Sequence, residues 1–221
     1  MDRRDFVSAL AGAVILRDMP RQTKPTGGVD LARLADSNSL KSGNRTASRL
    51  AEGSRIGVRL TAGSGESVAF VPGTDLTTGV ITCELRGKDV AQQSFLGVAF
   101  HGADDTTYDA VYFRPFNFRA ESPVNRSHAV QYHSLPTYGW QKLRTEQPGK
   151  YEKGVEPAPD PNGWFLARVV VGSNDVSVFV GDAKDPCLKV ALLGTRKQGL
   201  VGIWVGNNSG GDFANLTIAP A

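Results

Sequence analysis

Metal-binding patterns are scarce in this sequence. Its 221 residues include two cysteines and three histidines, with no Cys-x-x-Cys pair and no His/Cys cluster of zinc-site spacing. Asp104 and Asp105, beside His101, offer fewer oxygen atoms than the roughly six to eight that Ca²⁺ takes, so we expect turn formation from them and no cofactor. Cys83 and Cys187 could form one disulfide in an exported protein or stay reduced, because sequence separation does not define their Cα distance.

Long hydrophobic runs and clusters of like charge are absent too. The apolar stretch at 8–16 is too short to cross a bilayer core of about 30 Å as a helix. The chain has 25 Lys and Arg residues, of which five precede residue 25, and 22 Asp and Glu residues, of which three do. The rest of the chain therefore has a net charge of +1. This composition gives no electrostatic reason to expect nucleic acid or an anionic membrane as a partner. The oligomeric state is not indicated by the sequence.

The N-terminus predicts export. Its DRRDFV run, followed by the Ala- and Gly-containing stretch at 8–16, resembles a twin-arginine signal. Residues 17–28 contain Pro20, Pro25 and Gly27-Gly28 and are expected to form a tether. We therefore predict a signal and tether over 1–28, a domain over 29–221, and a periplasmic or extracellular location. The alternative is an N-terminal amphipathic helix that packs on the domain.

Glycine and proline are plentiful, with 25 and 12 residues, and they separate short apolar runs that alternate with polar residues. This pattern predicts an all-β, two-layer sandwich of antiparallel sheets, with helix expected only over Leu31–Asp36. Gly172 to Asp175 has the composition of a hairpin loop. The predicted strands are 56–60, 68–71, 81–85, 95–100, 110–113, 128–132, 164–171, 176–180, 188–193, 200–205 and 213–218.

The segment 114–162 departs from this pattern. It contains seven prolines and many of the aromatic and amide side chains of the chain. We predict a long insertion on the sandwich, and such loops commonly present functional side chains that strands would have to bury.

Four stretches resemble one known superfamily. They are SFLGVAFH at 94–101, YFRPFNF at 112–118, VQY at 130–132 and GDFANL at 211–216. Together they are similar to a bacterial branch of the concanavalin A-like lectin and glucanase superfamily, near the laminin G-like domains and the domain associated with keto-disaccharide hydrolases. The resemblance implies a jelly-roll β-sandwich over roughly residues 50–220. The Glu-x-Asp-x-x-Glu motif of the related family-16 glycoside hydrolases is absent, which disfavours a retaining glucanase mechanism.

Aromatic, amide and arginine side chains in and beside the insertion suit a saccharide, because flat rings cover a sugar face while polar groups bind its oxygens. The predicted ligand-binding residues are Tyr112, Arg114, Asn117, Gln131, Tyr132, Trp140, Arg144 and Tyr151. In the alternative interpretation, Arg114 clamps loop carbonyls, and Trp140 and Tyr151 pack the insertion onto the sandwich. Trp204 and the polar turn after it either line the same face or close the last strand pairing.

Three functions remain open from the sequence. The first is an exported module that binds a saccharide on the concave face of the sandwich. The second is a glycoside hydrolase or lyase that acts on a glycoside or keto-sugar, with His133, His101 and Glu152 as candidate catalytic groups. The third is a structural or protein-binding envelope domain.

Overall fold

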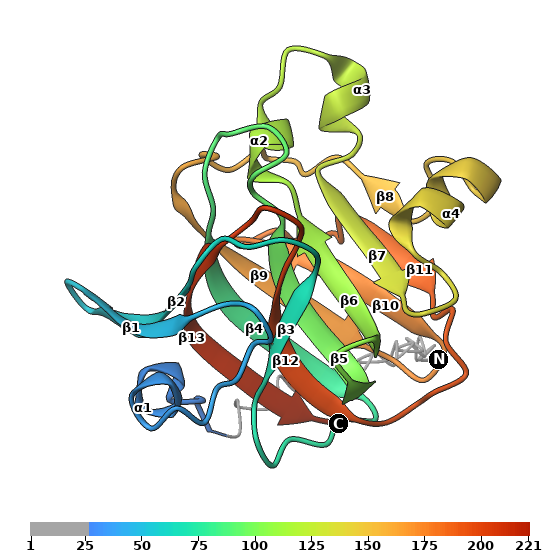
Figure 1. Cartoon of the computed structure of the whole chain (residues 1–221). Helices are drawn as coiled ribbons and strands as arrows, with labels where there is room; N and C mark the ends of the chain where they lie inside the picture. The colour runs from blue at the N-terminus through green and yellow to red at the C-terminus, as the bar shows by residue number, and fades with distance from the viewer. Residues whose placement is uncertain (1–26) are drawn as a thin grey trace, which may run out of the picture.

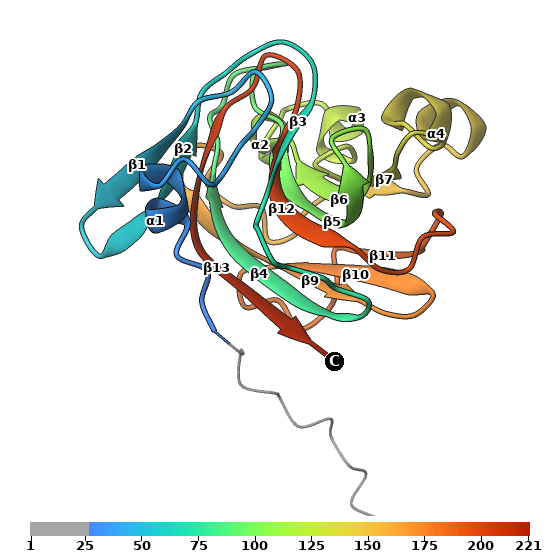
Figure 2. The ribbon, with the colours of Figure 1, turned by 60° about the horizontal axis from the view of Figure 1, so that its bottom comes forward.

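The computed structural model describes residues 27–221, so the predicted export signal and most of the tether lie outside the described residues. Two antiparallel sheets form a jelly-roll sandwich (Figures 1 and 2), which confirms the predicted fold class. One sheet has seven strands in the order β1-β2-β13-β4-β9-β10-β11, and the other has six in the order β3-β12-β5-β6-β7-β8. The strands are β1 Ala47–Glu52, β2 Arg55–Leu60, β3 Ser67–Phe70, β4 Gly79–Arg86, β5 Leu96–Asp104, β6 Thr107–Phe113, β7 Val130–Ser134, β8 Glu152–Lys153, β9 Trp164–Val171, β10 Asp175–Val180, β11 Leu188–Ala191, β12 Leu200–Val205 and β13 Gly211–Pro220.

Period-2 alternation builds the interior between the sheets. In β4 the side chains of Ile81, Cys83 and Leu85 are fully buried, while their neighbours Thr82 and Glu84 are partly exposed. The same alternation runs along β9, and inward residues of both sheets meet in one core. Successive side chains of a strand point to opposite faces, so this pattern is the direct result of the sequence.

The outward face of the six-stranded sheet is also apolar. A second buried cluster lies there, separate from the core between the sheets, and comprises Val68, Ala99, Tyr108, Ala110, Tyr112 and Trp204. His133 joins it, with its ring centroid 5.3 Å from that of Tyr112 and 5.6 Å from that of Trp204. The outer face of this sheet is therefore aromatic and buried, unlike that of the seven-stranded sheet. It forms the floor of the pocket described below.

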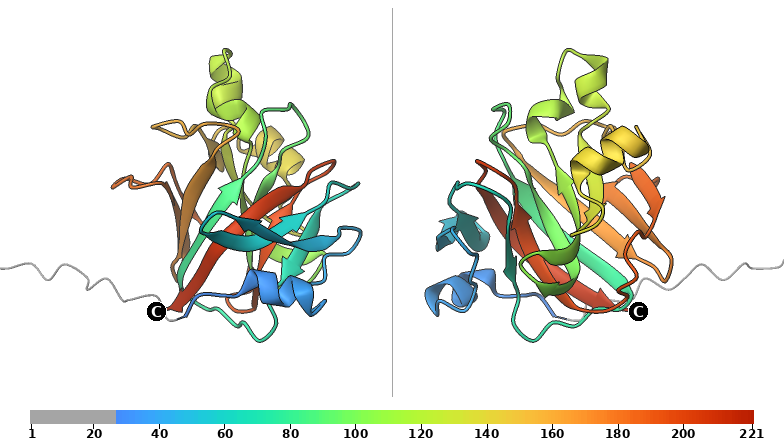
Figure 3. Two further views of the ribbon diagram at one scale, coloured as in Figure 1. Left: turned by 90° about the vertical axis from the view of Figure 1, so that its left-hand side faces the viewer. Right: turned by 45° about the vertical axis from the view of Figure 1, so that its right-hand side comes forward.

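Helices are more numerous than the sequence predicted. The predicted α1 Leu31–Asp36 is present, but α2 Pro115–Phe118, α3 Pro123–Arg126 and α4 Trp140–Glu146 were not expected. Pro115 and Pro123 open their helices at positions where a missing N–H and a fixed φ are favourable, and the side chain of Ser122 caps α3. These helices lie at the end of the sandwich opposite α1 (Figure 3). No helix in residues 27–221 is long and apolar enough to span a membrane.

The two cysteines are not paired. Both are free thiols, so the disulfide alternative is wrong. Cys83 lies inside the core, where burial raises its pKa. Cys187 follows β10, and burial raises its pKa to about 11. Both thiols therefore stay protonated at neutral pH and act as small apolar groups.

A charged ladder crosses the outer face of the seven-stranded sheet. Asp212 of β13 accepts hydrogen bonds from Arg59 of β2 at 2.6 and 2.8 Å and from Arg86 of β4 at 3.0 and 2.7 Å. Burial alone would raise the pKa of Asp212, but the hydrogen bonds from the two arginines outweigh it and lower the pKa. Asp212 thus joins three neighbouring strands, which supports the structural alternative for the end of the chain.

Replacing this carboxylate should weaken the sheet. We expect Asp212→Asn to lower the free energy of unfolding by about 1–2 kcal/mol, because two charge-assisted pairs are lost while half-exposed Arg59 can turn to water. Urea denaturation measures the change. Asp36→Asn, which breaks the exposed pair with Arg49 at 2.8 Å, is the matched control and should cost under about 1 kcal/mol. Equal effects of the two substitutions would contradict the role assigned to Asp212.

Candidate functional site

A pocket of about 390 Å³ opens on the outward face of the six-stranded sheet. Its floor comes from strands β6 and β12 and from Phe95, which precedes β5. Its walls come from the β4–β5 loop, the helices α2, α3 and α4, the turn after β12, and Glu66 before β3. The volume falls within the range of about 300–1,000 Å³ typical of small-ligand sites.

Aromatic rings form the floor and one wall. The ring of Tyr112 lies 4.6 Å from that of Trp204, tilted by 31°, and Phe95 packs edge-on against both Tyr112 and Phe116. Trp140, the first residue of α4, also lines the pocket and is 38% exposed, so part of this residue is open to a ligand. Tyr112 and Trp204 come from non-adjacent strands, so only the folded sheet brings their rings together.

Arg114 holds the polar side of the pocket in place. Its Nη1 donates to the carbonyl of His128 at 2.8 Å, and its Nη2 donates to the hydroxyl of Tyr112 at 3.0 Å and to Gln131 Oε1. The guanidinium also lies over the Tyr112 ring, 5.0 Å from its centroid. Burial lowers its pKa, but an arginine remains charged at any physiological pH. Arg114 therefore clamps a loop carbonyl, as the alternative interpretation predicted, and also lines the pocket.

Glu152 anchors the helix that carries Trp140. Arg144 of α4 donates to Glu152 through two parallel bonds, Nε to Oε1 at 3.0 Å and Nη2 to Oε2 at 2.6 Å. Arg114 Nη1 and His128 Nε2 lie 3.7 and 3.4 Å from the same carboxylate, whose side chain is 3% exposed. One buried carboxylate from β8 thus connects α4, the segment between α3 and β7, and the residue that precedes α2, and it fixes the wall of the pocket.

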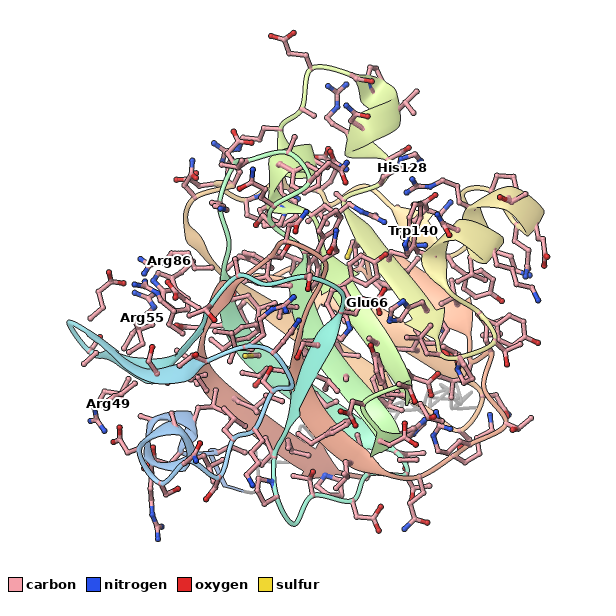
Figure 4. The ribbon with its side chains drawn as sticks, in the orientation of Figure 1. Arg49, Arg55, Glu66, Arg86, His128 and Trp140 are labelled. Carbon is pink, nitrogen blue, oxygen red and sulfur yellow. The ribbon has the colours of Figure 1, made fainter. Side chains whose placement is uncertain are left out.

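Glu66 provides a carboxylate on another wall. Its Oε2 accepts a hydrogen bond from the Tyr108 hydroxyl at 3.1 Å, and desolvation raises its pKa despite that bond. No salt bridge to Glu66 occurs within residues 27–221. Figure 4 shows Glu66 in front of the six-stranded sheet, with His128 and Trp140 displaced from it toward α4.

The structure brings most of the predicted ligand-binding residues together. Those that line the pocket are Tyr112, Arg114, Asn117, Trp140 and Arg144. Gln131 does not line it and instead supports it, because its Oε1 accepts from Tyr112 and Arg114. Tyr132 and Tyr151 face the core between the sheets, where their ring centroids lie 6.1 Å apart. These two are not brought to the pocket.

The three candidate catalytic groups do not line the pocket either. His133 is fully buried beneath Trp204, and neither ring nitrogen has a hydrogen-bond partner among the described residues. His101 is buried elsewhere, with Nδ1 3.1 Å from Asp109 and Nε2 2.9 Å from the Thr77 carbonyl. Glu152 is engaged by Arg144. The described structure thus gives none of them access to a substrate in this pocket.

Several lining residues were not singled out from the sequence as ligand contacts. Glu66, Phe95 and His128 line the pocket, and Trp204, named only as an alternative, lies at its floor. Trp204 and Tyr112 alternate with inward residues of their strands, so strand parity offered a signal for the floor. Glu66 precedes β3, and no local pattern connects it with the insertion.

Comparisons with known proteins support the fold. No protein-family model and no curated protein matches the sequence. The carbohydrate-binding module CBM66 of Bacillus subtilis is similar in structure, with 12% identity and a TM-score of 0.59 over 81% of this chain and 94% of the module. A Bacillus subtilis protein of unknown function with a galectin-like fold has 11% identity and a TM-score of 0.55, over 89% of this chain and 97% of its own. The Ca²⁺-bound exoplasmic/lumenal domain of VIP36 has 10% identity and a TM-score of 0.51, over 80% and 83% of the two chains. At such identities the likeness shows the jelly-roll fold alone.

Proposed function

We propose that this protein is an exported saccharide-binding domain whose ligand binds in the pocket on the outward face of the six-stranded sheet, the face that we assign as concave. The observation that carries the proposal is the composition of the pocket. The rings of Tyr112, Trp204 and Phe95 form the floor of the pocket, and the partly exposed Trp140 and several hydrogen-bonding side chains line it as well. Apolar rings with a few polar groups are what a sugar needs, because its ring face is apolar and its edge carries hydroxyls.

Two further observations support this proposal. The CBM66 structure, which is described as a carbohydrate-binding module, has the same fold over most of both chains. The amide side chains of Asn117, Asn125, Asn207 and Asn208 line the pocket and offer both donors and acceptors to hydroxyl groups. A structural envelope domain has no need of such a pocket.

Loss of the Trp140 ring should weaken binding. We expect Trp140→Ala to lower the affinity for a bound saccharide about tenfold, because ring stacking contributes about 0.5–1.5 kcal/mol beyond the apolar area that it buries. A glycan array followed by calorimetric titration identifies the ligand and measures its Kd. Saccharide-dependent change of tryptophan fluorescence is expected as well, since Trp140 and Trp204 both line the pocket.

Trp164 provides the matched control. It lies on the outer face of the seven-stranded sheet, with its ring 5.3 Å from the guanidinium of Arg55 and 4.8 Å from that of Arg86. Figure 4 shows these two arginines at the opposite edge of the molecule from Trp140. Trp164→Ala should leave the Kd unchanged. No binding across the array, or equal effects of the two substitutions, would refute the proposed site.

A further inference from the structure

Charge is distributed unequally across the pocket. Two arginines, Arg114 and Arg144, share the single carboxylate of Glu152 on one side. His128 does not change this balance at neutral pH, because burial, the largest effect, lowers its pKa. Among the described residues, Glu152 is the only carboxylate within salt-bridge distance of Arg114 and Arg144, so one of their two positive charges is uncompensated. Glu66 lines the same pocket but forms no ion pair with either arginine.

The uncompensated charge has free donors that a ligand can reach. Arg144 uses Nε and Nη2 on Glu152, and its Nη1 donates to no described residue. Its side chain is 36% exposed and lines the pocket, so Nη1 remains open to solvent or ligand. The guanidinium also lies over Trp140, 5.3 Å from its centroid, which places the free donors beside the proposed stacking ring. Both N–H groups of Nη1 and the second N–H of Nη2 are left, and this remaining edge of the planar guanidinium matches a carboxylate.

Glu66 restricts where a negative charge can bind. The carboxylate of Glu66 is exposed at the pocket, where it repels another anion but accepts hydrogen bonds from hydroxyl groups. A ligand that fits both walls thus has an acidic group at one end and hydroxyls at the other. A ligand that is charged on every side, such as a polysulfated glycan, does not satisfy the wall at Glu66.

Resting on the proposed function, we infer that the ligand is an acidic saccharide of the uronic acid class. Its carboxylate binds the free donors of Arg144 beside Arg114, its ring stacks on Trp140, and its hydroxyls donate to Glu66.

The test uses matched sugar pairs that differ only in the acidic group. Methyl glucuronoside is compared with methyl glucoside, and a galacturonate oligomer with the corresponding galactose oligomer, by calorimetric titration at neutral pH. We expect the acidic member of at least one pair to bind about tenfold more tightly than its neutral partner, as one charge-assisted hydrogen bond pair provides. Raising NaCl from about 0.05 M to about 0.5 M should weaken only the acidic member, because the pair is partly exposed to solvent.

Two variants locate the carboxylate. Arg144→Gln should bring the acidic member to within about threefold of the neutral one. Lys142→Gln is the control, because it makes the same charge change on the same helix at an exposed side chain that does not line the pocket. The salt dependence of the unsubstituted protein needs no variant, so it holds even if Arg144→Gln disturbs α4.

The outcomes separate this inference from the function on which it rests. Neutral sugars that bind as tightly as the acidic ones overturn the acidic ligand and leave saccharide binding intact. An acidic preference that Arg144→Gln does not reduce overturns the placement of the carboxylate. Absence of binding to both pairs and to the whole glycan array overturns both proposals.

Discussion

Glu152→Gln is expected to lower the free energy of unfolding by about 3–5 kcal/mol, the usual cost of breaking a buried ion pair by removing one partner. The side chain of Glu152 is 3% exposed and accepts both bonds from Arg144. The amide keeps the shape but removes the charge. Arg114, 6% exposed in its side chain, then lacks the only anion within 4 Å among the described residues. Urea denaturation with linear extrapolation measures the loss.

The same substitution should also impair the pocket. Glu152 fixes α4, which carries both Trp140 and Arg144 to the wall, so saccharide affinity is expected to fall along with stability. Glu146→Gln, at an exposed position of the same helix, is the matched control and should change stability by less than about 0.5 kcal/mol. A stability loss below about 1 kcal/mol for Glu152→Gln would show that the carboxylate does not hold this cluster.

His133 should make the protein sensitive to acid. Its pKa is lowered to about 4, chiefly by burial and also by nearby Arg114, against the opposite effect of Asp109. The unfolded chain titrates near 6.5, so between about pH 6.5 and pH 4 the unfolded state binds more protons than the folded one. Stability from this group is therefore present above about pH 6.5 and is lost as the pH falls. The expected loss between pH 7.5 and pH 4.5 is about 2–3 kcal/mol.

His133→Leu isolates this contribution. The substitution keeps a side chain of similar volume in the aromatic cluster and removes two ring nitrogens that have no partner among the described residues. At pH 7.5 the variant should be as stable as the unsubstituted protein or more so, and the difference should widen by about 2–3 kcal/mol at pH 4.5. Other groups titrate in both proteins and cancel in the comparison. Parallel pH profiles would contradict the buried, neutral state of His133.

The outcome for His133 also bears on catalysis. The sequence placed this histidine at a strand end near carboxylates, a position suited to a general base. In the structure it lies under Trp204 and outside the pocket lining. A neutral histidine that stays uncharged down to about pH 4 accepts protons poorly at neutral pH. The pH profile of stability thus tests its burial directly, without knowledge of any substrate.

Eleven of the thirteen strands in the described residues, and their order along the chain, followed from local pattern, whereas β1 and β8 were not predicted. Alternation over 81–86 identified the inward residues of β4, and the polar residues between β9 and β10 marked the hairpin turn between them. The three helices of the insertion were missed because each is short and carries no apolar periodicity, although Pro115 and Pro123 are typical first residues of a helix.

Strand parity could have corrected one part of the predicted site. Gln131 and Tyr132 were both predicted to bind the ligand, yet adjacent residues of a strand face opposite ways. Gln131 supports the pocket from the outward face, while the hydroxyl of Tyr132 donates to Asp109 in the interior at 2.9 Å. The sequence contained this alternation, but it did not show which face of β7 would lie toward the pocket and which toward the core between the sheets.

The sequence by itself determined the all-β sandwich, since alternating burial depends only on neighbours along each strand. It also placed the aromatic and arginine side chains of the site in one segment. Only the tertiary structure decided that Trp204 from β12 completes the floor and that Glu66 lines the pocket. It also decided that Glu152 forms a hydrogen-bonded ion pair with Arg144. These relations join residues far apart in the chain, and they depend on which strands pair and how the sheets cover each other, which no local pattern encodes.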